Sequence, residues 1–181
     1  GNVLAGPTFA ATRAVGGNVA ANDPFTYEAY LNQLPTNDIE SYGGSIQADY
    51  EIGAFSITSI TAYRKTKLAA DQDVDFTGLD FIREIRDQDV ETFTQEFRLT
   101  GDWNNRAFFL LGAFYSDEDM TVEDARIYGA DSRAYVDILT GGALAMFEAP
   151  LGFAPGTFYA EGGGTRFTAE QTDEQFQIFG Q

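Results

Sequence analysis

The chain of 181 residues contains no cysteine and no histidine. Without cysteine it can form neither disulfides nor thiolate metal sites. Without histidine it lacks imidazole acid–base chemistry, His-ligated zinc sites and serine-type triads. We therefore expect no enzymatic activity and no cofactor.

Basic residues and long apolar runs are also scarce. Lys and Arg number 11 against 28 Asp and Glu, which gives a net charge of −17 and argues against nucleic acid as a partner. No run approaches the roughly 18 apolar residues of a transmembrane helix. Strands of a transmembrane barrel alternate and never produce such a run, so a barrel stays open. A hydrophobic content of 44% excludes a disordered chain.

The sequence does contain segments in which apolar and polar residues alternate, most clearly Ile39–Ile52. Successive strand residues point to opposite faces, so one face collects the apolar residues and the other the polar ones. Tyr42 and Tyr50 share the apolar face, roughly 26 Å apart at about 3.3 Å per residue. On a strand tilted by about 40° this spans roughly 20 Å of height, close to the apolar band of an outer-membrane barrel and its aromatic girdles. A soluble sandwich strand shows the same alternation.

The alternating segments predict five strands, joined by connections of very different length. The strands are expected at about 39–51, 55–68, 89–100, 107–116 and 172–181. The connections are expected to be a tight turn at 52–54, a polar loop at 69–88, a short turn at 101–105 and a long insertion at 117–169. Short and long connections thus alternate, as periplasmic turns and extracellular loops do in outer-membrane barrels.

Both ends of the chain and one turn carry further expectations. Residues 1–38 are interpreted as irregular, with a short helix over Phe25–Leu34 capped by Asp23. The start shows no signal peptide, and the last residues alternate without a closing turn, so we expect a piece of a longer chain. Trp103 in the short turn is expected at the periplasmic membrane interface, where indole is favoured.

Five short segments add a resemblance to one known family. Ser56–Arg64 resembles a "TLTSITAYR" strand, Asp73–Thr77 a "DxDFTP" loop, Thr94–Leu99 an "SQELRL" strand, Gly112–Asp119 a "GLYYFDED" strand and Phe176–Gln181 a "YAVFGQ" strand start. These strings, in this order and spacing across about 39–122 and 171–181, resemble the barrel of TonB-dependent outer-membrane receptors.

The resemblance implies an importer in the bacterial outer membrane, surrounded by lipid and lipopolysaccharide. Such a receptor is a plugged barrel of the order of 22 strands. It captures a scarce nutrient of the siderophore, cobalamin or glycan class at its outer loops, and the TonB complex drives import. The sequence shows no plug and no TonB box. We therefore expect an all-β fold, an antiparallel meander that is a partial segment of a large transmembrane β-barrel with long extracellular loops: residues 1–38 lead in, and 39–181 form the barrel segment.

Two acidic clusters are the candidate ligand-binding residues. Asp71, Asp73 and Asp75 alternate like the start of a calcium loop, but the Gly and Glu that such a loop needs at its sixth and twelfth positions are replaced by Phe76 and Ile82. The pattern favours a solvated acidic loop over a metal site. The second cluster is Asp117, Glu118 and Asp119. Both are expected in long loops, either attracting cationic ligands or lying among divalent-bridged lipopolysaccharide.

The alternative is a small soluble β-barrel or sandwich that binds a ligand, with the apolar faces forming a core. Closing such a barrel takes roughly eight strands. The long insertion would have to supply the missing ones, and its two candidates are Tyr135–Leu139 and Thr157–Ala160.

Overall fold

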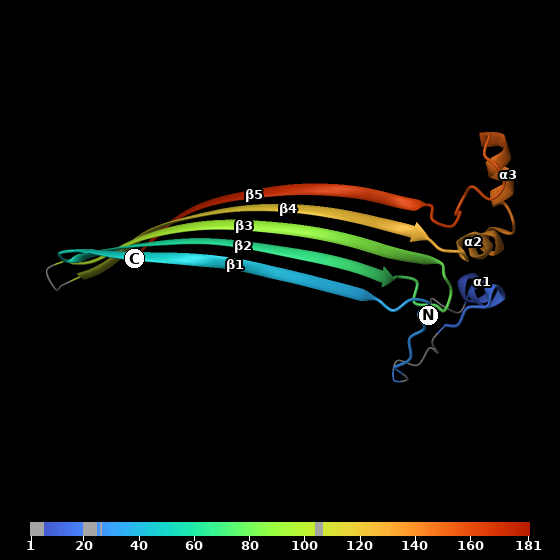
Figure 1. Cartoon of the computed structure of the whole chain (residues 1–181), viewed down its shortest axis with the longest axis horizontal. Coiled ribbons are helices and arrows are strands. Elements are labelled where there is room, and N and C mark those ends of the chain that lie inside the picture. The colour runs from blue at the N-terminus through green and yellow to red at the C-terminus, as the bar shows by residue number, and fades with distance from the viewer. Residues whose placement is uncertain (1–5, 20–24, 26, 104–106) are drawn as a thin grey trace. The chain divides into compact units, whose positions relative to one another are not determined.

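The computed structural model describes residues 6–19, 25, 27–103 and 107–181. The chain is mostly β: a single antiparallel meander sheet with the strand order β1-β2-β3-β4-β5, not closed into a barrel, plus short helices (Figure 1). The strands are β1 (Thr36–Ile52), β2 (Phe55–Asp73), β3 (Ile82–Trp103), β4 (Ala107–Tyr128) and β5 (Gly164–Gly180). The helices are α1 (Pro7–Val15), α2 (Ser132–Thr140), α3 (Leu144–Glu148) and the 3-10 turn η1 (Ala149–Leu151). The predicted five-strand antiparallel meander is confirmed.

The connections alternate in length as predicted. Residues 53–54 join β1 to β2, 74–81 join β2 to β3, 104–106 join β3 to β4, and 129–163 join β4 to β5. Gly53 has a φ of 61°, in the left-handed region that a two-residue hairpin turn favours. The short connections therefore fall at one end of the meander, and the long ones follow the opposite strand ends.

The strands are longer than the sequence predicts, and the expected bounds of the loops at 69–88 and 117–169 are wrong. Residues 69–73 end β2, 82–88 begin β3, and 117–128 continue β4. These segments are polar, which made them resemble loops, but their charges pair across strands. Arg86 Nη2 lies 2.7 Å from Asp124 Oδ2, and Arg126 Nε lies 3.2 Å from Glu84 Oε2. Opposite charges on facing strand residues stabilise the sheet where apolar alternation stops.

The helices also differ from expectation. Residues 27–34 are not helical, and Asp23 lies outside the described residues. A helix forms instead at α1, in the region interpreted as irregular. Pro7 occupies its first turn, where a missing N–H costs nothing, and Gly16 ends it with a φ of 98°. No described helix is long and apolar enough to cross a membrane.

The extra strands of the soluble alternative are absent from the described insertion. Tyr135–Leu139 lies within α2, and Thr157–Ala160 forms turns. The sheet therefore gains no strand from residues 129–163, and neither of the two segments that the soluble alternative offered as strands is one.

Contacts divide the chain into two compact units, which we describe separately. Unit 1 comprises residues 1–37, 69–86 and 124–167; unit 2 comprises 38–68, 87–123 and 168–181. All four buried apolar side chains that the described residues provide belong to unit 1: Ala11, Ala70, Leu79 and Leu144. There α1 contacts α2, and the backbone of Gly17 approaches Leu79 so closely that a Cβ would collide with it. Unit 1 thus has a small core, whereas the described part of unit 2 buries no large apolar side chain.

Candidate functional site

The register of the β1–β2 hairpin in unit 2 is set by side-chain hydrogen bonds. Thr58 Oγ1 donates to Asp49 Oδ1 at 2.6 Å, and the hydroxyls of Ser41 and Thr66 lie 3.0 Å apart. Facing residues of paired strands point to the same side of the sheet. Tyr50 therefore lies opposite Ile57, on the other side of the sheet from Asp49.

The same face continues over β3, β4 and β5. Thr61 Oγ1 donates to Gln95 Oε1 at 2.6 Å, and Thr172 Oγ1 donates to Asp119 Oδ1 at 2.7 Å. The rings of Phe93 and Tyr115 lie 6.5 Å apart. Even-numbered residues of β1 and β5 and odd-numbered residues of β2, β3 and β4 thus share one side of unit 2, which we call the apolar face.

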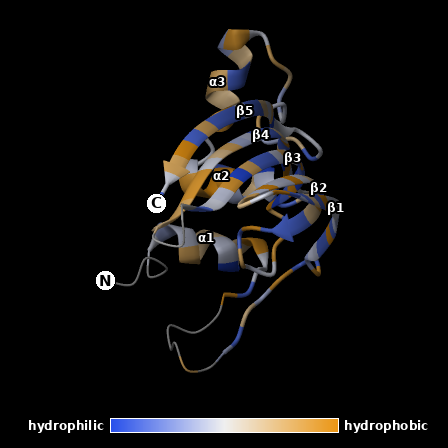
Figure 2. Ribbon diagram, turned by 90° about the vertical axis from the view of Figure 1, so that its left-hand side faces the viewer, coloured by the Kyte–Doolittle hydropathy of each residue, from blue (hydrophilic) through white to orange (hydrophobic). Residues whose placement is uncertain are grey.

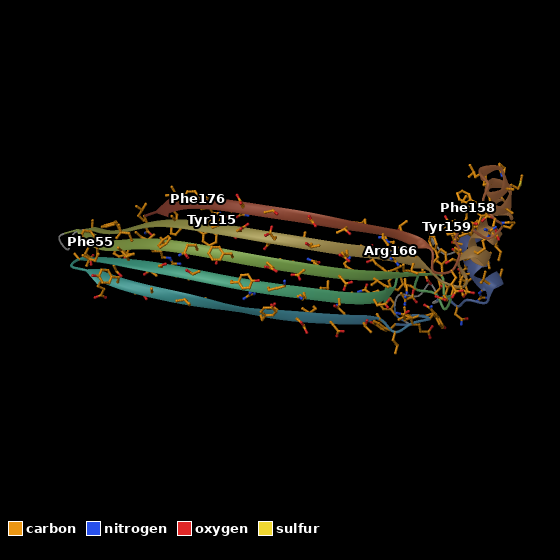
Figure 3. The ribbon with its side chains drawn as sticks, turned by 45° about the horizontal axis from the view of Figure 1, so that its top comes forward. Phe55, Tyr115, Phe158, Tyr159, Arg166 and Phe176 are labelled. Carbon is orange, nitrogen blue, oxygen red and sulfur yellow. The ribbon has the colours of Figure 1, made fainter. Side chains whose placement is uncertain are left out.

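The apolar face is largely uncovered. Figure 2 shows polar and apolar residues alternating along the strands, and Figure 3 labels Phe55, Tyr115 and Phe176, which belong to this face. Its exposed large apolar side chains are Tyr42, Ile46, Tyr50, Ile52, Phe55, Ile57, Tyr63, Phe93, Phe97, Leu111, Phe176 and Ile178. Of the described residues, only Ile39, Phe108 and Phe179 add exposed large apolar side chains to the opposite side of unit 2. A contiguous apolar surface of this size marks a site of contact with lipid or protein.

Along the strands the side chains of the apolar face change from apolar to charged. Between the short turns and Tyr63 it is mostly apolar, and the polar side chains of Ser59, Thr61 and Gln95 there hydrogen-bond to one another. Beyond Tyr63 come Lys65, Asp89 and Glu91: Lys65 Nζ lies 3.1 Å from Asp89 Oδ2 and also pairs with Glu91. Asp117, Asp119 and Glu174 continue this charged segment on β4 and β5. Aromatic rings thus lie where apolar surface gives way to charge.

The opposite side of unit 2 is polar, and we call it the polar face. It includes a depression of about 620 Å³ lined by hydroxyls, small residues and the side chain of Arg64. Near it, Arg98 Nε lies 2.6 Å from Glu96 Oε1. One side of the sheet therefore suits an apolar environment and the other an aqueous one.

Of the three aromatic residues predicted at a membrane interface, the structure describes the side chains of two. Tyr42 and Tyr50 both lie on the apolar face and are 55% and 67% exposed. Trp103 ends β3, but its side chain lies outside what the structure describes. Their position at a membrane interface stays a prediction.

Asp71, Asp73 and Asp75 do not form a free acidic loop. Asp71 and Asp73 lie in β2, and Asp71 Oδ2 is 3.4 Å from Arg83 Nη1. Asp73, only 4% exposed, accepts hydrogen bonds from the backbone N–H groups of Asn32, Asp75 and Phe76. These carboxylates shape the β2–β3 connection, as Asp side chains do in turns.

Asp75 accepts hydrogen bonds from the backbone N–H groups of Thr77 and Ile82 and from the Thr77 hydroxyl. Burial raises its pKa, although these hydrogen bonds oppose the shift. No group of three or more acidic side chains in the described ranges is arranged to hold a metal ion.

The second predicted cluster is not in a loop. Asp117, Glu118 and Asp119 lie inside β4, so Glu118 points to the polar face and its two neighbours to the apolar face. Glu118 accepts from the Thr92 hydroxyl at 3.0 Å, and Asp119 accepts from Thr172. The expectation of long loops is wrong for this cluster and for Asp71 and Asp73, because the strands extend through them, whereas Asp75 lies in the β2–β3 connection.

The structure instead reveals a polar hollow of about 660 Å³ in unit 1. Its wall comes from the segment before β1, the β2–β3 connection, the first residues of β3, the end of β4 and both ends of the β4–β5 connection. Its polar side chains are Asn32, Gln33, Asp80, Arg83, Asp131 and Glu161, and Tyr128 adds an aromatic ring. The sequence analysis missed these residues. The signal that could have found them is the meander itself, which brings all long connections to one side.

Hydrogen bonds hold the wall of the hollow in place. Asn32 Nδ2 donates to Asp80 Oδ1 at 3.1 Å, and the backbone N–H of Ala130 donates to Asp80 Oδ2 at 3.0 Å. The backbone N–H of Asp80 in turn donates to Asp131 Oδ2 at 2.9 Å. The ring of Tyr128 lies 4.9 Å from that of Tyr159, which Figure 3 labels beside Phe158. The two long connections are therefore tied together at this point.

The β4–β5 connection is organised by a buried ion pair. The carboxylate of Glu148, fully buried, pairs with the guanidinium of Arg133 and accepts hydrogen bonds from the backbone N–H groups of Gly156 (3.0 Å) and Phe158 (2.7 Å). The Arg133 guanidinium lowers the pKa of this carboxyl to about 2. Arg133 also bonds Asp137 at 2.7 Å. One carboxylate thus joins α2, α3 and the turns that follow.

Comparisons with known proteins add no relative. The sequence matches no protein-family model, and a search of curated proteins finds no match.

Proposed function

We propose that the chain is part of the wall of a TonB-dependent receptor in the bacterial outer membrane, which binds and imports a scarce nutrient. In this proposal the sheet is a segment of a large transmembrane β-barrel. The apolar face meets lipid, the polar face lines the lumen, and the long connections belong to the extracellular side. The whole receptor binds and transports the nutrient, and the chain performs no catalysis. The TonB complex acts through parts of the receptor outside this chain.

The observation that carries the proposal is the uncovered apolar face. A folded sheet that leaves so many Tyr, Phe and Ile side chains exposed needs an apolar environment over them. At about 25 cal/mol per Å² of apolar surface, leaving such a face in water would be costly. Lipid covers one side of a barrel wall, and the charged segment beyond Tyr63 then lies outside the hydrocarbon, among the lipopolysaccharide head groups.

The connections support the same orientation. Short connections join β1 to β2 and β3 to β4, and long connections follow the other strand ends, as in outer-membrane barrels. The segments behind the family resemblance also lie on neighbouring strands: Ser56–Arg64 in β2, Thr94–Leu99 in β3 and Gly112–Asp119 in β4. A barrel wall is built from such consecutive hairpins.

The experiment is fractionation of cells that make the whole protein containing this chain. Inner and outer membranes are separated on a density gradient, and the outer-membrane fraction is washed with urea and with alkaline carbonate. We expect the chain to stay in the washed outer membrane and to be released only by detergent. Recovery in the soluble fraction, or release by urea alone, would reject the membrane wall.

Import is tested separately in paired strains with and without a functional TonB protein. We expect energy-dependent ligand accumulation only when TonB is present. Accumulation that is equal in both strains would leave a barrel but contradict a TonB-dependent receptor.

A further inference from the structure

We propose that the polar hollow of unit 1 binds an uncharged, polyhydroxylated ligand, a short oligosaccharide. This inference rests on the proposed function, because it assigns a ligand class to a receptor whose nutrient could otherwise be a siderophore, cobalamin or a glycan. A volume of about 660 Å³ lies inside the range of about 300–1,000 Å³ usual for small-molecule sites.

The lining combines hydrogen-bond donors and acceptors. Arg83 supplies guanidinium N–H donors, Gln33 supplies an amide that can donate and accept, and Glu161 supplies carboxylate oxygens that only accept. A sugar hydroxyl both donates and accepts, so it can use all three kinds of group. No described residue forms a hydrogen bond with the side chains of Gln33 or Glu161, so these groups are open to a ligand.

The charges in the hollow disfavour the other ligand classes. Three carboxylates, those of Asp80, Asp131 and Glu161, outnumber the single guanidinium of Arg83. In a chain of net charge −17 this lining repels an anionic ferric chelate. Asp80 and Asp131 already accept hydrogen bonds from the wall, and Arg83 offsets part of the remaining negative charge, so little free carboxylate is left for a cation. An uncharged ligand is repelled neither by the carboxylates nor by the guanidinium.

Tyr128 supplies an aromatic ring, which is a common part of a sugar-binding site. Tyr128 is one of the residues that line the hollow, and its ring lies against Tyr159 at a centroid distance of 4.9 Å. An aromatic ring offers a flat apolar surface to the C–H face of a pyranose, while planar amide and carboxylate groups reach its equatorial hydroxyls. Tyr159 has a φ of 56°, a conformation that costs a non-glycine residue energy and that occurs often at functional sites.

Hydrogen bonds within the chain hold the wall together. Asp80 and Asp131 hold each other's segments through backbone and side-chain hydrogen bonds, and Asn32 joins the segment before β1 to the carboxylates of Asp80 and Asp73. A pre-formed wall lowers the entropy that binding costs. The site therefore does not depend on the ligand to assemble it.

The test uses the whole detergent-solubilised protein on a printed array of neutral and acidic glycans, followed by calorimetric titration of the best neutral glycan. Ferric citrate and spermidine serve as anionic and cationic probes. We expect binding of neutral glycans with a Kd between about 1 µM and 1 mM, and no binding of ferric citrate or spermidine. Absence of every neutral glycan from the bound set, or binding of ferric citrate at this site, would overturn the proposal.

Variants locate the site. Tyr128→Ala should weaken glycan binding at least about tenfold, a loss of about 1.4 kcal/mol. Tyr128→Phe keeps the ring against Tyr159 and should bind within about threefold of the parent, a control that remains valid if the alanine variant fails to fold. Glu161→Gln should weaken binding, because a charge-assisted hydrogen bond becomes a neutral one. Glu170→Gln, the same change on exposed β5, should have no effect.

The two proposals fail in different ways. If the chain stays in the washed outer membrane but binds no neutral glycan, the barrel wall is supported and the sugar site is rejected. If the chain binds glycans through Tyr128 but is recovered as a soluble protein, the sugar site is supported and the receptor is rejected. If glycan binding is unchanged in both Tyr128→Ala and Glu161→Gln, the ligand binds elsewhere and the hollow is not its site.

Discussion

The hydroxyl of Thr58 donates a hydrogen bond of 2.6 Å to the carboxylate of Asp49 across the β1–β2 hairpin. Both residues lie on the polar face. Because side chains alternate along a strand, this pair shows which other residues of β1 and β2 lie on the same face. Ile57 therefore lies on the apolar face, and Ile60, three residues along the same strand, lies on the polar face. The two isoleucines provide a matched test of the lipid-facing role.

Ile57→Lys should weaken assembly in the outer membrane. A lysine facing lipid costs about 2–4 kcal/mol at the bilayer midplane and about 0–1 kcal/mol near an interface, and Ile57 lies opposite Tyr50, one of the aromatic residues expected at an interface. Ile60→Lys places the same side chain on the polar face, near Glu96, and should be tolerated. Heat-modifiable mobility on gels and recovery in the washed outer membrane measure both variants. Equal effects of the two substitutions would contradict the assignment of faces.

Glu148→Gln should open the β4–β5 connection while the sheet stays intact. The change removes the negative charge that Arg133 pairs with inside the buried cluster. We expect limited proteolysis within residues 141–157 to become about tenfold faster or more, because local opening requires less free energy. Glu170→Gln is the control and should be cleaved at the parent rate. Full protection of the loop in Glu148→Gln would show that the ion pair does not organise it.

The same carboxylate predicts a pH dependence. The pKa of Glu148 falls from an ordinary value of 4.5 to about 2 on folding, so its stabilising contribution is fully present above pH 4.5 and is lost as the pH falls toward 2. The backbone amide of Phe158, which donates to Glu148, reports this change in an NMR titration. We expect its low-pH transition to centre near 2 and to vanish in Glu148→Gln. A midpoint near 4.5 would contradict the buried ion pair.

Gly129→Ala should separate the two long connections. A Cβ at Gly129 would collide with both the carboxylate and the backbone carbonyl of Asp80. We expect a cost of about 1–3 kcal/mol, typical of overpacking at a close backbone contact. Hydrogen exchange of the Asp131 amide, which donates to the Asp80 carbonyl at 2.8 Å, measures the loss.

The control for that change is Gly44→Ala. A Cβ at Gly44 meets no atom within 4 Å, and its backbone does not lie in the left-handed region. It should leave the Asp131 amide as protected as in the parent. Unchanged protection of the Asp131 amide in Gly129→Ala would show that the added Cβ is accommodated without separating the two connections, and would contradict the prediction.

The sheet could be predicted from the sequence because its main signal is local. Alternation along β1 and the two-residue turn at Gly53 give strand, direction and face without any distant contact. The lengths of β2, β3 and β4 could not be predicted in the same way. Their outer parts are polar, and only cross-strand pairs such as Arg86 with Asp124 make them strands. Those pairs join residues far apart in sequence.

The helices and the hollow show two further limits of sequence reasoning. The signals for α1 were present, with Pro7 at its start and Gly16 after its end, but the small residues between them resembled an irregular segment. The hollow carried no local signal. Asn32, Asp80 and Glu161 come from three separate connections and meet only once the meander has formed. The acidic clusters at Asp71–Asp75 and Asp117–Asp119 are conspicuous in the sequence because their carboxylates lie close together along the chain, but most of these carboxylates bond the backbone or a neighbouring strand.

The central claim is that one face of unit 2 meets lipid, and the absence of cysteine makes a direct measurement straightforward. Single cysteines placed one at a time at positions 45–52 of β1 carry a nitroxide label, with the whole protein in outer-membrane vesicles. Collision with oxygen, which concentrates in lipid, is compared with collision with a water-soluble nickel chelate. We predict oxygen-dominated collision at positions 46, 48, 50 and 52 and nickel-dominated collision at 45, 47, 49 and 51. Nickel accessibility at all eight positions, without a period of two, would contradict a lipid-facing sheet.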